Sequence, residues 1–397
     1  MKNNWQTKKL GELCEKITDG SHFSPKSIQS GSYPYITVRD IKNDGQIDFE
    51  NCKFIDAENY ILLTKNGCQP FYGDVLFSKD GTVGKVSLVD FKKDFVVLSS
   101  LAIIRPRQSI IDSYYLKYIL QSPSFLNTAI GNKTGVAIKR IILKNLGQIQ
   151  ISYPESLSEQ KRIVALLDDI FEKIEKAKKN TEKNLQNSRE LFEAYLQNIF
   201  QNSNFDYKLL GEICDVIGGG TPSKANGKFY NGDIPWATVR DMKNDIIKET
   251  EHKITKDAVK NSSTNIIPKN NVVITTRVGL GKICLLEHDT AINQDLRGIV
   301  PLNSNKLSVN YLFWWFKSIS QIIIDNGTGA TVHGVKLPFI KGLLIPLPSI
   351  SGQKVIVKKL DELSMQTKKL EEIYKNKLAD LEELKKSVLK KAFAGEL

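Results

Sequence analysis

Apolar side chains recur at steps of three and four residues through a long stretch of the chain, from Gln353 to Phe393. This spacing places them along one face of an α-helix and approaches the heptad seam of a coiled coil. The stripe consists of Ile356, Leu360, Leu363, Thr367, Leu370, Tyr374, Leu381, Leu384 and Val388. The other faces are mostly lysine and glutamate, and Gly395 follows the last apolar position, where a helix usually ends. The pattern therefore predicts one long amphipathic helix.

The same pattern occurs earlier, from Gln160 to Phe200, and a single offset of 193 residues aligns the two stretches without a gap. Each helix would be about 60 Å long at about 1.5 Å per residue, which is more than one globular core can cover. We therefore expect the two helices to pack against each other. Two unrelated coiled-coil arms would have a similar composition, but the repeat extends beyond the helices.

The residues before each long helix form two copies of one plan, in which four blocks recur in the same order. The paired blocks are KKLGELCEKITDG and KLLGEICDVIGGG from Lys8 and Lys208, YPYITVRDIKN and IPWATVRDMKN from Tyr33 and Ile234, GDVLFSKDGTVGKVSLV and NNVVITTRVGLGKICLL from Gly73 and Asn270, and NKTGVAIKRIILKNLGQIQISYP and NGTGATVHGVKLPFIKGLLIPLP from Asn132 and Asn326. A period this long indicates a duplicated module, since solenoid repeats are far shorter. Like modules in one chain tend to pack around a pseudo-twofold axis.

Short runs of β-branched and aromatic residues predict strands within each copy. These runs are Tyr35–Val38, Val75–Ser78, Val96–Ile104 and Gln148–Ser152, with Val272–Thr276 and Leu343–Leu347 in the second copy. Short helices are expected at Ser113–Gln121 and Val309–Lys317, and the aromatic cluster Leu312–Trp315 is expected in the core rather than as a platform for stacked bases. The fold class is therefore α+β: two tandem globular α/β domains, each followed by a long helix, with the two helices packed against each other.

The net charge of +12 raises the expectation of a polyanionic partner. Residues 1–157 carry +5 and residues 201–350 carry +4, so a nucleic-acid surface belongs mainly to the globular parts. No segment resembles a signal peptide or a membrane span, and five dispersed cysteines indicate neither a disulfide framework nor a zinc site. We therefore expect a cytoplasmic protein with no membrane partner.

The motifs of common enzymes are missing. No Asp/Asn-Pro-Pro-aromatic loop or GxGxxG turn is present, and the Gly-Lys pairs at Lys85 and Lys282 lack the spacing and the hydroxyl residue of a phosphate loop. The four histidines do not cluster with cysteines or paired carboxylates. Cys14 and Cys214 occupy matching positions and suit small buried apolar roles. The sequence therefore favours a binding protein with no catalytic residues, no metal and no cofactor of its own.

Taken together, these motifs resemble the specificity subunit of type I restriction–modification systems. The resemblance rests on the paired Leu-Gly-Glu openings, the loop Gly219–Ser223, the Val-Arg-Asp blocks, the Gly-Lys hairpins, the proline exits into Gln-Lys helices, and the ending LKKAFAGEL. Each motif is weak alone, but their order, occurring twice, is specific. The resemblance covers essentially the whole chain.

The resemblance implies a role for each part. Residues 1–157 and 204–350 would be target-recognition domains that each read half of a split double-stranded DNA target, and residues 158–203 and 351–397 would be spacer helices. The helices would pack as an antiparallel coiled coil that holds the domains a fixed distance apart. They would also dock two modification subunits, which carry S-adenosylmethionine and methylate adenine. Restriction subunits, with motor and nuclease activity, would join for cleavage. Because the two domains differ in sequence, the half-sites should differ as well.

The residues that contact DNA should lie in loops that differ between the copies, because identical residues cannot distinguish two half-sites. The candidates are Ser21, His22, Ser24, Lys26, Lys79, Lys133 and Lys139 in the first copy, Thr221, Ser223, Lys224, Arg277, Thr331 and His333 in the second, and the matching Lys85 and Lys282 for phosphates. Arg39 and Arg240, within the shared Thr-Val-Arg-Asp, suit an ion pair with Asp40 or Asp241, or a phosphate contact.

Two other functions remain open at this point. A stand-alone nuclease or methyltransferase with unrecognised motifs would turn over DNA by itself. A coiled-coil adaptor that binds only proteins would show no salt-dependent DNA binding, whereas a protein that neutralises several phosphates shows a steep dependence.

Overall fold

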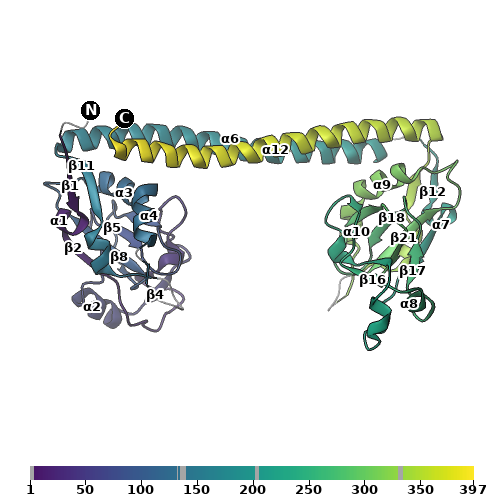
Figure 1. Cartoon of the computed structure of the whole chain (residues 1–397), viewed down its shortest axis with the longest axis horizontal. Helices are drawn as coiled ribbons and strands as arrows, with labels where there is room; N and C mark the ends of the chain where they lie inside the picture. Colours follow the sequence, from purple (N-terminus) through teal and green to yellow (C-terminus); the bar gives the residue numbers. More distant parts are fainter. Residues whose placement is uncertain (1–3, 132, 135–139, 202–204, 330–333) are drawn as a thin grey trace. The chain divides into compact units, whose positions relative to one another are not determined.

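The computed structural model describes residues 4–131, 133–134, 140–201, 205–329 and 334–397 and divides the chain into two compact units (Figure 1). The first unit comprises Met1–Glu182 and Asn376–Leu397, and the second comprises Lys183–Lys375. Each long helix therefore contributes one part to each unit. Within the described residues, no helix is both long and apolar enough to cross a membrane. The domain boundaries after residues 157, 203 and 350 stay predictions.

The first unit is built on a four-stranded antiparallel sheet with the order β2-β8-β5-β6. Its strands are β2 (Cys14–Asp19), β8 (Leu101–Pro106), β5 (Val75–Ser78) and β6 (Val86–Leu88). A smaller sheet joins β4 (Lys53–Ile55), β3 (Tyr33–Ile36) and β7 (Val96–Val97), and two strand pairs join β1 (Trp5–Lys9) to β11 (Gln150–Pro154) and β9 (Lys133–Thr134) to β10 (Arg140–Ile141). The helices are α1 (Leu10–Leu13), α2 (Ala57–Lys65), α3 (Ser113–Gln121), α4 (Pro123–Gly131) and α5 (Leu143–Gln148).

The second unit repeats this plan with a five-stranded sheet, in the order β13-β21-β18-β19-β15, and a four-stranded sheet, in the order β16-β14-β20-β17. Their strands are β13 (Cys214–Gly218), β21 (Leu296–Pro301), β18 (Val272–Thr275), β19 (Ile283–Leu286), β15 (Ile246–Ile247), β16 (His252–Ile254), β14 (Ile234–Ala237), β20 (Thr290–Ile292) and β17 (Asn265–Ile267). β12 (Tyr207–Leu209) pairs with β22 (Leu344–Pro346), and the short helices are α7 (Leu210–Ile213), α8 (Lys256–Lys260), α9 (Val309–Ser318), α10 (Ser320–Asp325) and α11 (Leu337–Lys341).

The predicted α+β class and the two long helices are confirmed: α6 spans Leu157–Gln201 and α12 spans Ile350–Ala394. The strand Val75–Ser78 and the helix Ser113–Gln121 match their predicted bounds. The residues predicted as one strand from Val96 to Ile104 form two strands instead, because the chain turns between β7 and β8 and enters different sheets. The cluster Leu312–Trp315 is buried in the core, as predicted.

Within each unit the parts of α6 and α12 run antiparallel. In the first unit, Lys178 of α6 pairs with Glu382 at 2.7 Å, and Glu175 pairs with Lys385 at 3.8 Å. Residue numbers therefore rise along α6 in the direction in which they fall along α12. In the second unit, Arg189 of α6 pairs with Glu371 at 3.0 Å. Apolar residues from both helices also enter the globular cores, as Phe171 and Leu389 do in the first unit.

A buried glutamine joins each long helix to its globular part. Gln160 is fully buried; its side-chain carbonyl accepts from Asp112 N at 2.8 Å, and its amide donates to the carbonyls of Ile110 and Pro154, both at 2.9 Å. Gln353 makes the same three bonds, with Ser308 N at 2.8 Å and with the carbonyls of Lys306 at 2.8 Å and Pro348 at 2.9 Å. These are the glutamines that the 193-residue offset pairs.

Two further paired contacts hold the helices to α3 and α9. Asp168 accepts a hydrogen bond from Tyr118 of α3, and Asp361 accepts one from the indole of Trp314 of α9 at 2.8 Å. A phenylalanine near the carboxyl end of each long helix also packs against a tyrosine of a module. Phe393 packs edge-on against Tyr115 in the first unit, and Phe200 packs against Tyr311 in the second. The internal repeat is therefore a repeat of tertiary contacts.

Replacing Gln160 by alanine should lower the free energy of unfolding by about 3 kcal/mol, since it leaves one N–H group and two carbonyls unpaired in a dry site. Gln353→Ala should lower the free energy of unfolding by a similar amount. Urea unfolding of the full chain measures both. The control is Gln186→Ala on the same helix, where the side chain is exposed and bonds only Glu190. Equal stability of Gln160→Ala and Gln186→Ala would contradict a role for the glutamine in attaching the helix.

Candidate nucleic-acid interface

In the first unit, three loops that the sequence singled out meet at one edge of the main sheet. The loop after β2 begins at Gly20, directly after Asp19, and the hairpin after β5 begins at Lys79. Ser21 N donates to Val97 O at 2.9 Å, Lys79 N donates to Ser100 O at 2.9 Å, and Ile141 N donates to Lys79 O at 2.9 Å. The last bond ties the β9–β10 hairpin to the β5–β6 hairpin. These bonds place the starts of the first two loops, and strand β10, close to one another.

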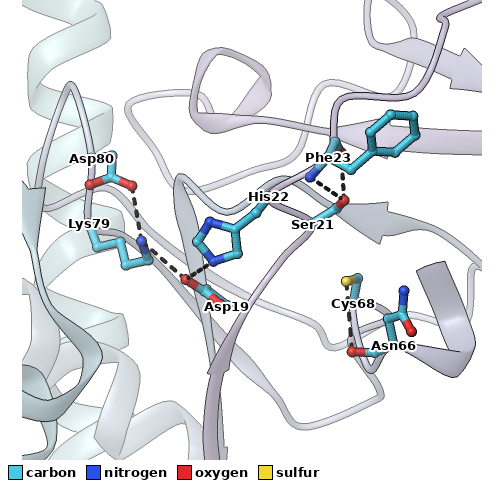
Figure 2. A network of polar contacts seen from close by, with 8 residues as sticks. All are labelled: Asp19, Ser21, His22, Phe23, Asn66, Cys68, Lys79 and Asp80. Atoms are coloured by element: carbon cyan, nitrogen blue, oxygen red, sulfur yellow. Dashed lines mark hydrogen bonds and ion pairs between the residues drawn. The ribbon is translucent and has the colours of Figure 1, made fainter.

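A charged network lies between two of these loops (Figure 2). Asp19 Oδ2 lies 3.1 Å from His22 Nε2 and 3.3 Å from Lys79 Nζ, and Lys79 Nζ also lies 2.9 Å from Asp80 Oδ2. The Lys79 side chain is only 6% exposed, whereas His22 is largely exposed. Lys79 therefore neutralises two carboxylates inside the protein, and His22 is the member of the network that faces solvent.

The second unit brings the corresponding loops together. Gly220 N donates to Ile292 O at 3.0 Å, Thr276 N donates to Asp295 O at 2.8 Å, and Val335 N donates to Thr276 O at 2.9 Å. Two of these loops border a hollow of about 850 Å³, whose lining includes Thr221, Lys224, Arg240, Glu251, His252, Val278, Asn293, Gln294 and Asp295, with Tyr230 and Trp236. The side chain of Thr221 hydrogen-bonds Gln294. The lining includes cationic, amide and hydroxyl groups, which can recognise phosphates and base edges, beside two carboxylates.

The shared Thr-Val-Arg-Asp is a structural turn in both units. Thr37 N and Thr37 Oγ1 both donate to Asp40 Oδ2 at 2.7 Å, and Thr238 makes the same pair of bonds to Asp241 at 2.7 and 3.0 Å. The expected ion pairs of Arg39 with Asp40 and of Arg240 with Asp241 are wrong, because the threonine holds each carboxylate. Both arginines are exposed; the Arg240 side chain is 80% exposed and approaches only Glu251, at 3.9 Å, among the described residues. They are free to contact phosphates.

Lys85 and Lys282 brace this turn from the Gly-Lys hairpins. Lys85 Nζ donates to the carbonyls of Val38, at 3.3 Å, and Ile41, and Lys282 Nζ donates to Val239 O at 3.4 Å. The hairpins themselves are held alike, since Ser78 Oγ donates to Thr82 O at 2.7 Å and Thr275 Oγ1 donates to Gly279 O at 2.8 Å. Each lysine therefore has a structural role, and its predicted phosphate contact stays a prediction.

The remaining candidates fall into three groups. His22, Ser24, Lys26, Ser223, Lys224 and Arg277 are exposed on the loops, Thr221 is half-buried, and Ser21 is buried with its hydroxyl turned to the backbone of Phe23. Arg277 lies 3.7 Å from Asp295. Lys133 belongs to β9, whereas Lys139, Thr331 and His333 lie outside the described residues. The structure thus brings the described parts of these loops together and leaves their DNA contacts as predictions.

Sequence reasoning missed Asn293, Gln294 and Asp295, which form one wall of the hollow. The sequence does contain a pattern that could have identified them. This Asn-Gln-Asp run separates two apolar strands, and a polar run in that position indicates a loop at the end of the strands. Asn293 Nδ2 donates to Asp295 Oδ2 at 3.0 Å, so the run is partly fixed before any ligand binds.

The structure gives no sign of redox or metal chemistry in its described part. No group of three or more histidine, cysteine or carboxylate side chains there could hold a metal ion. Burial raises the pKa of both Cys14 and Cys214 to about 12, which keeps these thiols protonated and unreactive. Both are buried, as predicted.

Comparison with known proteins points to one family. The family model described as "Type I restriction modification DNA specificity domain" matches residues 2–183 and 202–380. The Type I restriction enzyme EcoR124I/EcoR124II specificity subunit of Escherichia coli is 30% identical over 272 residues, 65% of each chain. The MjaIX specificity subunit of Methanocaldococcus jannaschii is 32% identical over 46% of this chain and 45% of its own length, so these two matches span less than two thirds of the relatives. The putative MjaX specificity subunit of the same organism is 24% identical over 99% of this chain and 94% of its own.

Two solved structures share the fold. A chain from a study described as "Structural basis underlying complex assembly and conformational transition of the type I R-M system" aligns over 100% of this chain and 99% of its own, with a TM-score of 0.80 and 20% identity. The HsdS subunit from Thermoanaerobacter tengcongensis aligns over 100% of this chain and 98% of its own, with a TM-score of 0.63 and 19% identity.

Replacing Lys79 by methionine should destabilise the first unit by about 2 kcal/mol, because it leaves Asp19 and Asp80 close together without their shared cation. The shift of the urea unfolding transition measures this. Lys26→Met, on an exposed lysine of the neighbouring loop, is the control and should leave stability unchanged. If Lys79→Met kept full stability and lost only DNA affinity, the ammonium would serve DNA and not the network.

Proposed function

Because the chain belongs to the family of type I restriction–modification DNA specificity domains, we propose that it is the subunit that selects the DNA sequence for a methyltransferase and endonuclease complex. In this proposal each globular module binds one half of an asymmetric bipartite target. The chain itself supplies recognition, and the chemistry belongs to its partners. The alternative of a stand-alone DNA-modifying enzyme has no observation in its favour.

One observation supports this proposal above all others. The two units hold the same loops at the same sheet edge through matching backbone bonds, from Lys79 O to Ile141 N and from Thr276 O to Val335 N. The side chains on those loops differ, since one unit presents His22 where the other has Pro222. A shared frame with different exposed side chains is what two readers of unlike half-sites require.

Charge supports DNA as the ligand. The globular parts carry most of the net charge of +12, and the exposed arginines of the two structural turns, Arg39 and Arg240, occupy equivalent places. Equivalent cations suit phosphates, which are the same in every sequence, and the differing loop side chains suit bases. We assign positioning to the first group and base readout to the second.

The long helices would dock two modification subunits, which bind S-adenosylmethionine, and restriction subunits would join this core. Some apolar side chains of the helices remain partly exposed: Leu370 and Ile373 of α12, outside the apolar core cluster of the second unit, are 42% and 49% exposed. One helical turn separates them, so they share a face. An apolar face flanked by lysine and glutamate suits a partner helix.

Co-expression with the cognate modification subunit in a host without DNA methylation should produce N6-methyladenine within one split motif. Sequencing of the genome for this base should give two unlike half-sites around a fixed gap. Replacing residues 201–350 by the corresponding module of another family member should change one half only. A short continuous motif would contradict the two-module proposal, and turnover of DNA by the chain alone would contradict the absence of catalytic residues.

Replacing both Leu370 and Ile373 by glutamate should weaken the binding of the modification subunit by at least about 10-fold, because two desolvated anchors are lost. Glutamate keeps helix propensity, so the chain should still fold. Isothermal titration measures the affinity. The control is Lys375→Glu, which makes the same change in net charge at an exposed position on another face of the helix. Equal affinities of the two variants would exclude this face as the docking site.

A further inference from the structure

Phe23 is an apolar side chain in the middle of the polar reading loops of the first unit. It follows His22 in the loop after β2, and it is 61% exposed, more than any other phenylalanine in the described part of the chain. Leaving most of a phenyl ring in water forgoes the free energy that its burial would give. The ring is therefore available to a ligand that contacts this loop.

The backbone holds Phe23 in a fixed position. Ser21 is buried and paired with the strand segment beside it, because Ser21 N donates to Val97 O and Ser99 N donates to Ser21 O, each at 2.9 Å. Phe23 N in turn donates to Ser21 Oγ at 3.1 Å, and Ser21 Oγ donates to Phe23 O at 2.5 Å. Figure 2 shows both bonds, with the ring extending away from the Asp19–Lys79 network. The backbone of Phe23 is thus anchored before a ligand binds, which lowers the entropy cost of a contact made by its side chain.

The chemistry of DNA limits which groups the exposed ring can contact. Among the base edges of the major groove, the apolar group is the 5-methyl of thymine, and phenylalanine is one of the side chains that contact it. Polar neighbours such as His22 and Lys26 can hydrogen-bond base edges or phosphates, but they cannot detect a methyl group. A phenyl ring adds this capacity to the loop.

The second unit has no such ring at the matching place. Aligning Gly20 with Gly220 places Ser223 opposite Phe23. One exposed apolar side chain of the second unit's loops, Val278, lies instead in the Gly-Lys hairpin, where the first unit has Gly81. The ring is therefore specific to the first module, as a residue that distinguishes half-sites must be.

We propose that Phe23 reads the 5-methyl group of a thymine in the half-site bound by the first module. The inference rests on the proposed function, because it presupposes that this module reads DNA. It adds a specificity residue that the comparison of polar loop residues did not identify, and it requires at least one A·T pair in that half-site.

The test uses the assembled complex with the modification subunits and duplexes that carry the mapped target. Each thymine of the first half-site is replaced in turn by deoxyuridine, which removes only the methyl group. Wild type should bind about 3- to 10-fold more weakly at one position, in line with the loss of one buried methyl. Phe23→Ala should bind the thymine duplex more weakly by a similar factor and show no further loss with deoxyuridine. Phe23→Leu should keep part of the discrimination.

Controls separate this inference from the proposed function. Deoxyuridine in the second half-site should affect wild type and Phe23→Ala alike, and an unchanged second half-site in the methylation map shows that the variant is folded. The inference is overturned if no thymine of the first half-site is sensitive, if Phe23→Ala keeps the sensitivity, or if that half-site lacks an A·T pair. A complex with no bipartite motif at all would instead overturn the proposed function.

Discussion

The architecture depends on how a long charged helix is attached to a globular module, and two buried glutamines provide that attachment. Gln160 and Gln353 each use both amide hydrogens and the carbonyl oxygen on backbone groups that the module leaves unpaired. Neutral groups suit this place, because a buried lysine or glutamate would bring an unpaired charge into a dry site. The bonds fix where the helix starts, and Asp168 and Asp361 then fix which face it turns to the module.

The same loops carry two kinds of residue with separate tasks. Residues that the copies share, such as Thr37 with Asp40 and Thr238 with Asp241, are occupied by bonds within the protein. Several residues that differ, such as His22 and Lys224, are exposed. A frame stabilised by its own bonds can accept new exposed side chains at little cost in stability, since surface substitutions usually change the free energy of unfolding only slightly.

The sequence predicted elements whose bounds follow from local composition and period. It did not predict features that depend on residues far apart in the sequence. Val75–Ser78 and Ser113–Gln121 were predicted with their bounds, because composition and period define such elements. The break between β7 and β8 was missed, because an apolar run does not show which of two sheets each half will join. The burial of Lys79 was not predicted either, because its side chain pairs with Asp19, 60 positions earlier, and no spacing rule reveals that pairing. Exposure of Phe23 likewise depends on Ser21 and the strand beside it.

The end of α12 has a consequence for the order of events at the ribosome. Leu389, Ala392 and Phe393 belong to the core of the first unit, although the whole of Lys183–Lys375 is synthesised before them. The first globular part therefore emerges with an apolar groove beside Tyr115 that stays open until the second has been translated. Nascent chains fold largely from the N-terminus, so this unit cannot complete its core until its last segment is synthesised, and a ribosome that stalls within the second half leaves that apolar surface exposed.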